Sequence, residues 1–153
     1  SPETLAAMPE TEIAGAIDHA GFYNIKAKNI KEVSGIIKGK YGNRVPSNIE
    51  ELLELPGVGR KTANLTISLG YGIPAICVDT HVHRISNRTG WVKTKTPEQT
   101  EQSLMTVLPA EFWIKINEIL VLFGQSLCTP LSPHCGLCPI RGDCERRGVT
   151  RRR

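Results

Sequence analysis

Four cysteines near the end of the chain have the residue type and the spacing to bind a metal centre. Cys128, Cys135, Cys138 and Cys144 follow the pattern C-x6-C-x2-C-x5-C. Thiolates are soft ligands, and four of them can bind one zinc ion or an iron–sulfur cluster. The irregular spacing differs from the paired C-x2-C motifs of a zinc ribbon. On ligand chemistry alone, zinc and iron–sulfur are near parity.

A second motif is a glycine turn, which consists of Leu55, Pro56, Gly57, Val58 and Gly59 and leads into Arg60 and Lys61. Two glycines around one small residue permit a tight turn, and the helix predicted after it offers backbone N–H groups and a dipole to an anion. A DNA phosphate can dock there without sequence readout. A plain turn between two helices is the alternative. A nucleotide-binding P-loop is excluded, because its pattern requires glycine at positions 55 and 60.

Lys61 and Asp79 are candidates for covalent and electrostatic catalysis. Lys61 falls in the first turn of its predicted helix, where the dipole disfavours the ammonium form, and a pocket without water would disfavour it further. A neutral amine can attack a sugar C1′ and form a Schiff base. Asp79 precedes another predicted helix, and its carboxylate can stabilise positive charge on the sugar. The ordinary alternatives are a surface lysine and a helix N-cap.

Helical periodicity runs through nearly all of the chain, which predicts an all-α fold. Capping boxes are predicted at Ser47 with Glu50 and at Thr96 with Gln99, and Thr80 is a predicted cap of a further helix. The expected helices cover residues 23–41, 49–69 with the glycine turn as an interruption, a segment after Thr80, a segment after Thr96, and residues 110–124.

The composition changes after Gly124, where prolines, glycines and the four cysteines replace the helical pattern. We therefore predict a helical domain over 1–124, a cysteine module over 125–146 and a basic tail over 147–153. The module has too little apolar content to hold its structure without a metal.

The chain has 153 residues, a net charge of +4 and 40% hydrophobic residues, which suits a globular monomer and permits a polyanionic partner. No apolar run approaches the roughly 18 residues of a membrane span. We expect no secretory signal at Ser1, so five cysteines favour metal ligation over disulfides. An intracellular setting follows, in the cytoplasm or nucleoid of a prokaryote or the nucleus of a eukaryote.

Three motifs together resemble one enzyme family. Residues 55–63, Leu-Pro-Gly-Val-Gly-Arg-Lys-Thr-Ala, resemble the helix-hairpin-helix of the endonuclease III family of DNA glycosylases, and residues 78–82, Val-Asp-Thr-His-Val, resemble its aspartate motif. The cysteine spacing resembles that of its [4Fe-4S] module. The resemblance implies a bifunctional DNA glycosylase and AP lyase of base excision repair, which removes oxidised pyrimidines and nicks the strand by β-elimination. Lysine at position 61 fits this, since relatives that only excise the base lack it.

The resemblance also implies roles for particular residues. Lys61 and Asp79 would be catalytic, and the four cysteines would hold the cluster, which we expect to be structural. Double-stranded DNA with a damaged base or an abasic site would contact Phe22, His81 and the hairpin residues Leu55, Pro56, Gly57, Val58, Gly59 and Arg60. An enzyme that extrudes a nucleotide needs an apolar side chain to fill the gap, and Phe22 matches that position. A core role for Phe22 is about equally acceptable on pattern.

Two departures from the family pattern affect these expectations. Relatives have helices before the segment that resembles Ser1–Tyr23, so the N-terminal helices of the family are expected to be missing. A lyase-only or non-catalytic DNA-binding fragment is therefore the alternative function. The loop between the first two cysteines, residues 129–134, has no Lys or Arg, so we expect no phosphate contact from it. Arg141, Arg146 and Arg147 can compensate.

Overall fold

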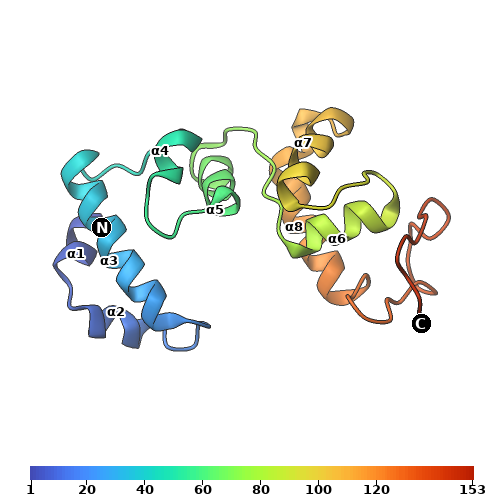
Figure 1. Ribbon diagram of the computed structural model, residues 1–153, viewed down its shortest axis with the longest axis horizontal. Helices are drawn as coiled ribbons and strands as arrows, with labels where there is room; N and C mark the ends of the chain where they lie inside the picture. Colours follow the sequence, from blue (N-terminus) through green and yellow to red (C-terminus); the bar gives the residue numbers. More distant parts are fainter. The chain divides into compact units, whose positions relative to one another are not determined.

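The computed structural model describes residues 1–153 and confirms an all-helical fold without strands (Figure 1). The chain divides into two compact units, Ser1–Ala63 and Asn64–Arg153. The predicted boundary between helical domain and cysteine module at residue 124 falls inside the second unit and stays a prediction. No helix combines the length and apolar composition that a membrane crossing requires.

In the first unit, two short helices pack against one long helix. Helix α3 (Tyr23–Lys40) packs against α1 (Pro2–Ala7) and α2 (Glu10–Ala16), as Figure 1 shows at the blue end of the chain. The bounds of α3 match the predicted helix. Its buried side includes Ala27 and Ser34, which lie close to two helical turns apart, and Ile37, which follows nearly one turn later.

The predicted helix-hairpin-helix forms from α4 (Ile49–Leu53) and α5 (Arg60–Leu65). The predicted Ser47 cap is wrong by one residue: the Asn48 side chain accepts from the Glu51 N–H at 2.8 Å and caps α4. Ser47-x-x-Glu50 and Asn48-x-x-Glu51 overlap in the sequence, and the pattern alone cannot separate them. Buried Leu52 and Leu55 anchor the hairpin to the unit.

The hairpin itself is a hydrogen-bonded turn. The Val58 N–H donates to the Leu55 carbonyl at 3.1 Å, with Pro56 and Gly57 at the two central positions. Gly57 has φ +74°, the left-handed value that the second central residue of a type II turn requires. A Cβ on Gly57 would lie 2.4 Å from Nδ2 of Asn29 on α3. Glycine is thus required here by backbone conformation and by close packing.

The second unit is built around α6 (Thr80–Thr89), which packs against α7 (Pro97–Val107) and α8 (Trp113–Ser126). A π-helical turn (Thr66–Gly70) follows α5, and a 3-10 turn (Ala110–Phe112) precedes α8. Helix α7 begins as predicted, with the Thr96 side chain accepting from the Gln99 N–H. The core consists of Ile76, Val78, Val82, Ile85, Val92, Leu104, Ile116 and Leu120.

The segment before α6 crosses this core without regular structure. Ile76 and Cys77 are almost completely buried, and their carbonyls accept from the side-chain amides of Asn64 and Asn117, each at 3.0 Å. Buried carbonyls outside helices need such partners, because an unpaired one is costly. The two asparagines therefore fix the extended path that leads to Asp79.

The hairpin analysis predicts different outcomes for its two glycines. Gly57→Ala should lower the free energy of unfolding by about 2 kcal/mol, because alanine is strained at positive φ and its methyl group meets Asn29. Gly59→Ala is the matched control: its Cβ would meet nothing within 4 Å, so we expect a change within about 0.5 kcal/mol. Urea unfolding followed by circular dichroism measures both. Equal destabilisation by the two variants would contradict the packing argument.

Candidate functional site

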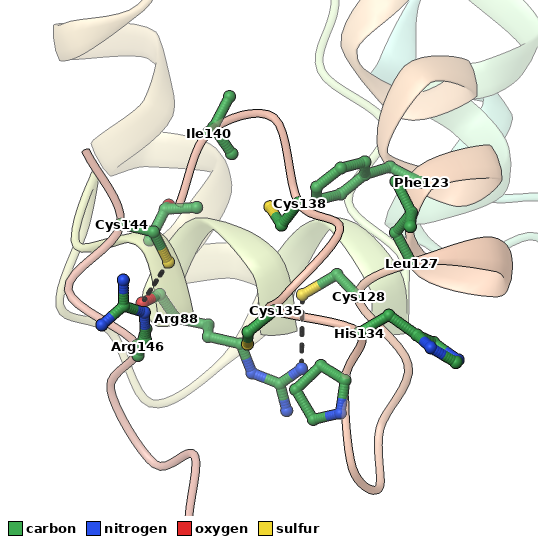
Figure 2. Close-up of a pocket in the computed structure, with 12 residues that line it drawn as sticks. Arg88, Phe123, Leu127, Cys128, His134, Cys135, Cys138, Ile140, Cys144 and Arg146 are labelled. Carbon is green, nitrogen blue, oxygen red and sulfur yellow. Dashed lines mark hydrogen bonds between the residues drawn. The ribbon is translucent and has the colours of Figure 1, made fainter. Parts of the chain in front are cut away.

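The four cysteines line a single pocket in the second unit (Figure 2). Phe123 from α8 and Leu127, which follows the last residue of that helix, form part of its apolar wall, together with Pro133 and Ile140. The close-up shows Cys128 near the end of α8 and the other three cysteines on the irregular chain that follows. Residues separated by up to sixteen positions are thus gathered around one cavity, as the spacing predicts.

This cysteine loop is fastened to the end of α6 at both of its ends. The Arg88 guanidinium donates from Nη1 to Cys128 Sγ at 3.3 Å and to the Thr129 carbonyl at 2.8 Å, and from Nη2 to the Pro130 carbonyl at 3.1 Å. In the opposite direction, the last carbonyls of α6 accept from the loop: Glu145 N–H donates to Thr89 and Arg147 N–H to Arg88. A helix end leaves such carbonyls unpaired, and the loop satisfies them.

The charge around the pocket suits an anionic group. Arg88 is buried, and the hydrogen bonds of Arg84 and Arg88 go to carbonyls, to sulfur and to His81, not to carboxylates. Burial, and then the positive charge of Arg88, lower the pKa of Arg84, while Cys128 and Asp79 act in the opposite direction. Two neighbouring cations without carboxylate partners are unfavourable unless another negative charge is near. Four thiolates around iron and sulfur supply it.

The arrangement fits a cluster better than a single ion. No group of three or more His, Cys, Asp or Glu side chains could hold a metal ion as placed. Tetrahedral zinc would need its sulfurs about 3.8 Å apart, given Zn–S bonds of about 2.3 Å. The cysteines instead surround an apolar-walled pocket, which suits a cluster bound through one thiolate at each corner.

His81 and Arg84 pack against α8 where Gly124 leaves room. The Arg84 Nη2 group lies 3.1 Å from His81 Nδ1 and donates to the carbonyls of Gly124 (3.2 Å) and Cys128 (2.9 Å). A Cβ on Gly124 would lie 2.4 Å from His81 Nδ1 and 2.8 Å from Arg84 Nη2. One turn of α6 is thus joined both to α8 and to the first cysteine.

Asp79 is the N-cap of α6. Its Oδ1 accepts from the N–H groups of His81 (2.9 Å) and Val82 (2.8 Å), which corrects the predicted Thr80 cap. The hydroxyl of Thr80 comes one residue too late, whereas the Asp79 backbone is extended, as an N-cap requires. The capping bonds use one carboxylate oxygen. The Asp79 side chain as a whole is half-buried.

Lys61 lies in the first turn of α5, directly after the glycine turn, and its side chain is exposed. This is the position in the first helical turn that the sequence predicts for Lys61. Of the predicted DNA-contacting residues, Leu55 is buried under the turn, Gly57 and Gly59 are exposed, and Pro56, Val58 and Arg60 are half-buried.

Phe22 is exposed, so a core role is excluded for this side chain. It is 82% accessible and precedes α3 with a left-handed backbone, φ 58°. A bulky residue with positive φ is strained, and such strain gathers at functional positions. Both observations are compatible with the predicted contact to DNA.

Sequence reasoning missed Arg84, Arg88 and Gly124. Arginines four residues apart on a helix suggest a solvated face, and nothing in the pattern indicates that Arg88 is buried. A glycine inside the apolar run of α8 was a usable signal, because helix interiors contain glycine mainly where another group approaches closely.

Comparison with family models shows the class of protein to which this chain belongs. Residues 1–110 match the family model of the HhH-GPD superfamily base excision DNA repair protein, and residues 128–144 match that of the iron-sulfur binding domain of endonuclease III. The helix-hairpin-helix and the cysteine module therefore belong to one known architecture. The match at 128–144 confirms the predicted iron–sulfur module, and the four cysteines lie within the matched residues.

The relatives identify the family more narrowly. The chain is 50% identical to endonuclease III of Thermotoga maritima, over 97% of this chain and 71% of that one, and 40% identical to endonuclease III of Bacillus subtilis, over 99% and 72%. It spans only 39% of a chloroplastic homologue from Arabidopsis thaliana, with 46% identity over 94% of this chain. A solved structure of a trapped endonuclease III–DNA covalent intermediate superposes with a TM-score of 0.88 at 38% identity, over 95% of this chain and 69% of that one. The chain belongs to the endonuclease III family of DNA glycosylases and AP lyases.

The cap geometry of Asp79 predicts that its structural and chemical roles are separable. Asp79→Asn keeps an oxygen that can accept the two capping N–H groups, so unfolding free energy should stay near that of the wild type. Asp79→Ala removes the cap and should cost about 1 kcal/mol. Urea unfolding measures both. A loss in Asp79→Asn as large as that in Asp79→Ala would show that charge, and not the hydrogen bonds, stabilises α6.

Proposed function

We propose that this chain excises oxidised pyrimidines from double-stranded DNA and nicks the strand at the resulting abasic site, with Lys61 as nucleophile. The observation that carries the proposal is the position of Lys61. Its amine is exposed in the first turn of α5, directly after the glycine turn of residues 55–59, at which a DNA phosphate could dock. Family membership supplies the reaction class, and the residue supplies the step that distinguishes a lyase from a simple glycosylase.

The proposed covalent step forms one bond as another breaks. The neutral Lys61 Nζ attacks C1′ of the damaged nucleotide, the C1′–N bond breaks, and the base leaves with a proton. Opening of the sugar ring gives a Schiff base between Nζ and C1′. Loss of a proton from C2′ then expels the 3′-phosphate by β-elimination, which cuts the strand. The attack needs the amine in its neutral form, because an ammonium nitrogen has no free electron pair.

Asp79 is proposed to assist charge separation at the sugar. Because Oδ1 is held by two backbone N–H groups, the carboxylate is fixed at the start of α6. A carboxylate at this position can stabilise positive charge as the base leaves or relay a proton. His81, one residue into the helix, is a candidate contact to the target nucleotide.

The DNA would be held mainly through its backbone. The turn over residues 55–59, followed by Arg60, can accept a phosphate without base contacts, and Phe22 would enter the stack where the base has left. We expect the protein to act as a monomer on DNA that contains a damaged base or an abasic site, inside the cell where chromosomal DNA lies.

Borohydride reduction tests the Schiff base. On abasic duplex DNA, the wild type should give a covalent protein–DNA product, and Lys61→Gln and Lys61→Arg should give none. Arginine retains the positive charge but cannot form the imine, so it separates nucleophilicity from phosphate attraction. Lys115→Gln serves as a control that should trap normally. Undiminished trapping by Lys61→Gln would remove Lys61 from the mechanism.

The same samples distinguish the alternative functions. Nicking of abasic DNA together with excision of thymine glycol supports the full activity. Nicking without excision indicates a lyase-only chain, and binding without either reaction indicates a DNA-binding module.

The position of Phe22 gives a further prediction. Phe22→Ala should lower excision from duplex DNA roughly tenfold, because about 1.4 kcal/mol of the compensation for unstacking is lost. Nicking of a single-stranded abasic substrate should change little, since no stack needs filling. Ile25→Ala, which truncates another exposed apolar residue of α3, is the matched control. Equal losses on both substrates would argue against insertion into the stack.

A further inference from the structure

Asn64 is buried in the second unit, and its side chain joins α5 to a distant part of the chain. The side chain is 1% exposed, and its Nδ2 group donates to the carbonyl of Ile76 at 3.0 Å. Its Oδ1 atom is buried as well and has no hydrogen-bond partner. A rotated amide would bring two oxygen acceptors together, so only this orientation satisfies the Ile76 carbonyl. The asparagine therefore serves as a donor, at the cost of one unpaired oxygen.

This hydrogen bond connects the two segments that carry the proposed catalytic residues. Asn64 follows Lys61 by three positions in α5, and Ile76 precedes Asp79 by three positions. Along the chain, the connection between them is much longer and includes the π-helical turn Thr66–Gly70. Turns of this kind are rare and are frequent at functional sites. The bond closes the loop that contains the turn, and it gives Lys61 and Asp79 a short connection that does not depend on the loop.

The elements on both sides of the bond are fixed. In α5, residues three positions apart lie on neighbouring parts of one helix face, so the helical backbone relates Asn64 to Lys61. Beyond the bond, Ile76 and Val78 belong to the core, and the backbone then reaches Asp79 as the N-cap of α6. A site supported by such elements keeps its geometry more closely than a site on loops.

We propose that Asn64 is a positioning residue for base excision, and that its hydrogen bond to Ile76 sets the place of the Lys61 amine relative to the Asp79 carboxylate. The inference rests on the proposed function, in which both groups act on one nucleotide. Attack at C1′ and stabilisation of the developing charge coincide as the base leaves. A misplacement of about 1 Å can then lower the rate roughly 100-fold. Asn64 acts through these two residues and is assigned no contact with the nucleotide.

The variant Asn64→Leu tests this role, because it removes the donor and the unpaired oxygen and nearly keeps the volume of the side chain. Three quantities are measured on the cluster-containing full chain: the single-turnover rate of thymine glycol excision, the rate of borohydride trapping on a preformed abasic duplex, and the affinity for a duplex with a non-cleavable abasic analogue. Excision should fall about tenfold or more, because it needs both groups in place. Trapping and binding involve no departing base and should stay within about twofold of the wild type.

Leu104→Ala is the control for a purely structural loss. It truncates a fully buried side chain in the core of the same unit and leaves the bond between Asn64 and Ile76 in place. Excision, trapping and binding should therefore change by one common factor. A common factor in Asn64→Leu as well, or undiminished excision by that variant, would overturn the positioning role. A wild type that does not excise thymine glycol would instead refute the proposed function, and this inference with it.

Asn64→Asp tests the donor itself through the pH profile. A protonated carboxyl can donate to the Ile76 carbonyl and an ionised one cannot, and burial favours the protonated form. The ratio of excision to trapping, divided by the wild-type ratio at the same pH, should therefore be close to one at about pH 5.5, and any loss should appear only towards about pH 8. A ratio that stays about tenfold below one at every pH would contradict the donor role.

Discussion

The buried guanidinium of Arg88 is the contact on which the second unit depends. It joins the end of α6 to the first residues of the cysteine loop, while the last residues of that loop return hydrogen bonds to the same helix end. A charged group without its partners would destabilise the interior strongly, so the position of the loop follows from that of the helix. Because Asp79 caps the other end of α6, one ten-residue helix connects the candidate carboxylate with the cysteine pocket.

This arrangement gives the cluster a mechanical role without any need for electron transfer. The carbonyls of Thr129 and Pro130 accept hydrogen bonds from the Arg88 side chain. The backbones of Pro133 and Gly136 are hydrogen-bonded to the backbone of Arg153. The loop would therefore be stabilised from inside by its cofactor and from outside by arginines. Chains with so little apolar content seldom fold unless such groups bind them. The catalytic chemistry proposed for Lys61 and Asp79 needs no redox change, which is consistent with a cluster that positions protein on DNA.

Much of this structure was predictable from the sequence, and the failures have physical causes. Helical periodicity, the type II turn with Pro56 and Gly57, and the grouping of the cysteines all follow from local rules that leave few alternatives. Helix caps were misplaced by one residue at Ser47 and Thr80, since neighbouring polar side chains compete for the same N–H groups. The roles of Arg88 and Arg153 depend on contacts with residues more than twenty positions away, and no local pattern encodes those contacts.

The close approach at Gly124 has a consequence for how such sequences can diverge. A Cβ at position 124 would overlap with the imidazole of His81 and the guanidinium of Arg84. Positions 81, 84 and 124 therefore cannot vary independently. A larger residue at 124 becomes acceptable only in a chain where position 81 has already lost its ring. Substitution order is thereby constrained, and a histidine beside the candidate carboxylate should be inherited together with a glycine some forty residues later.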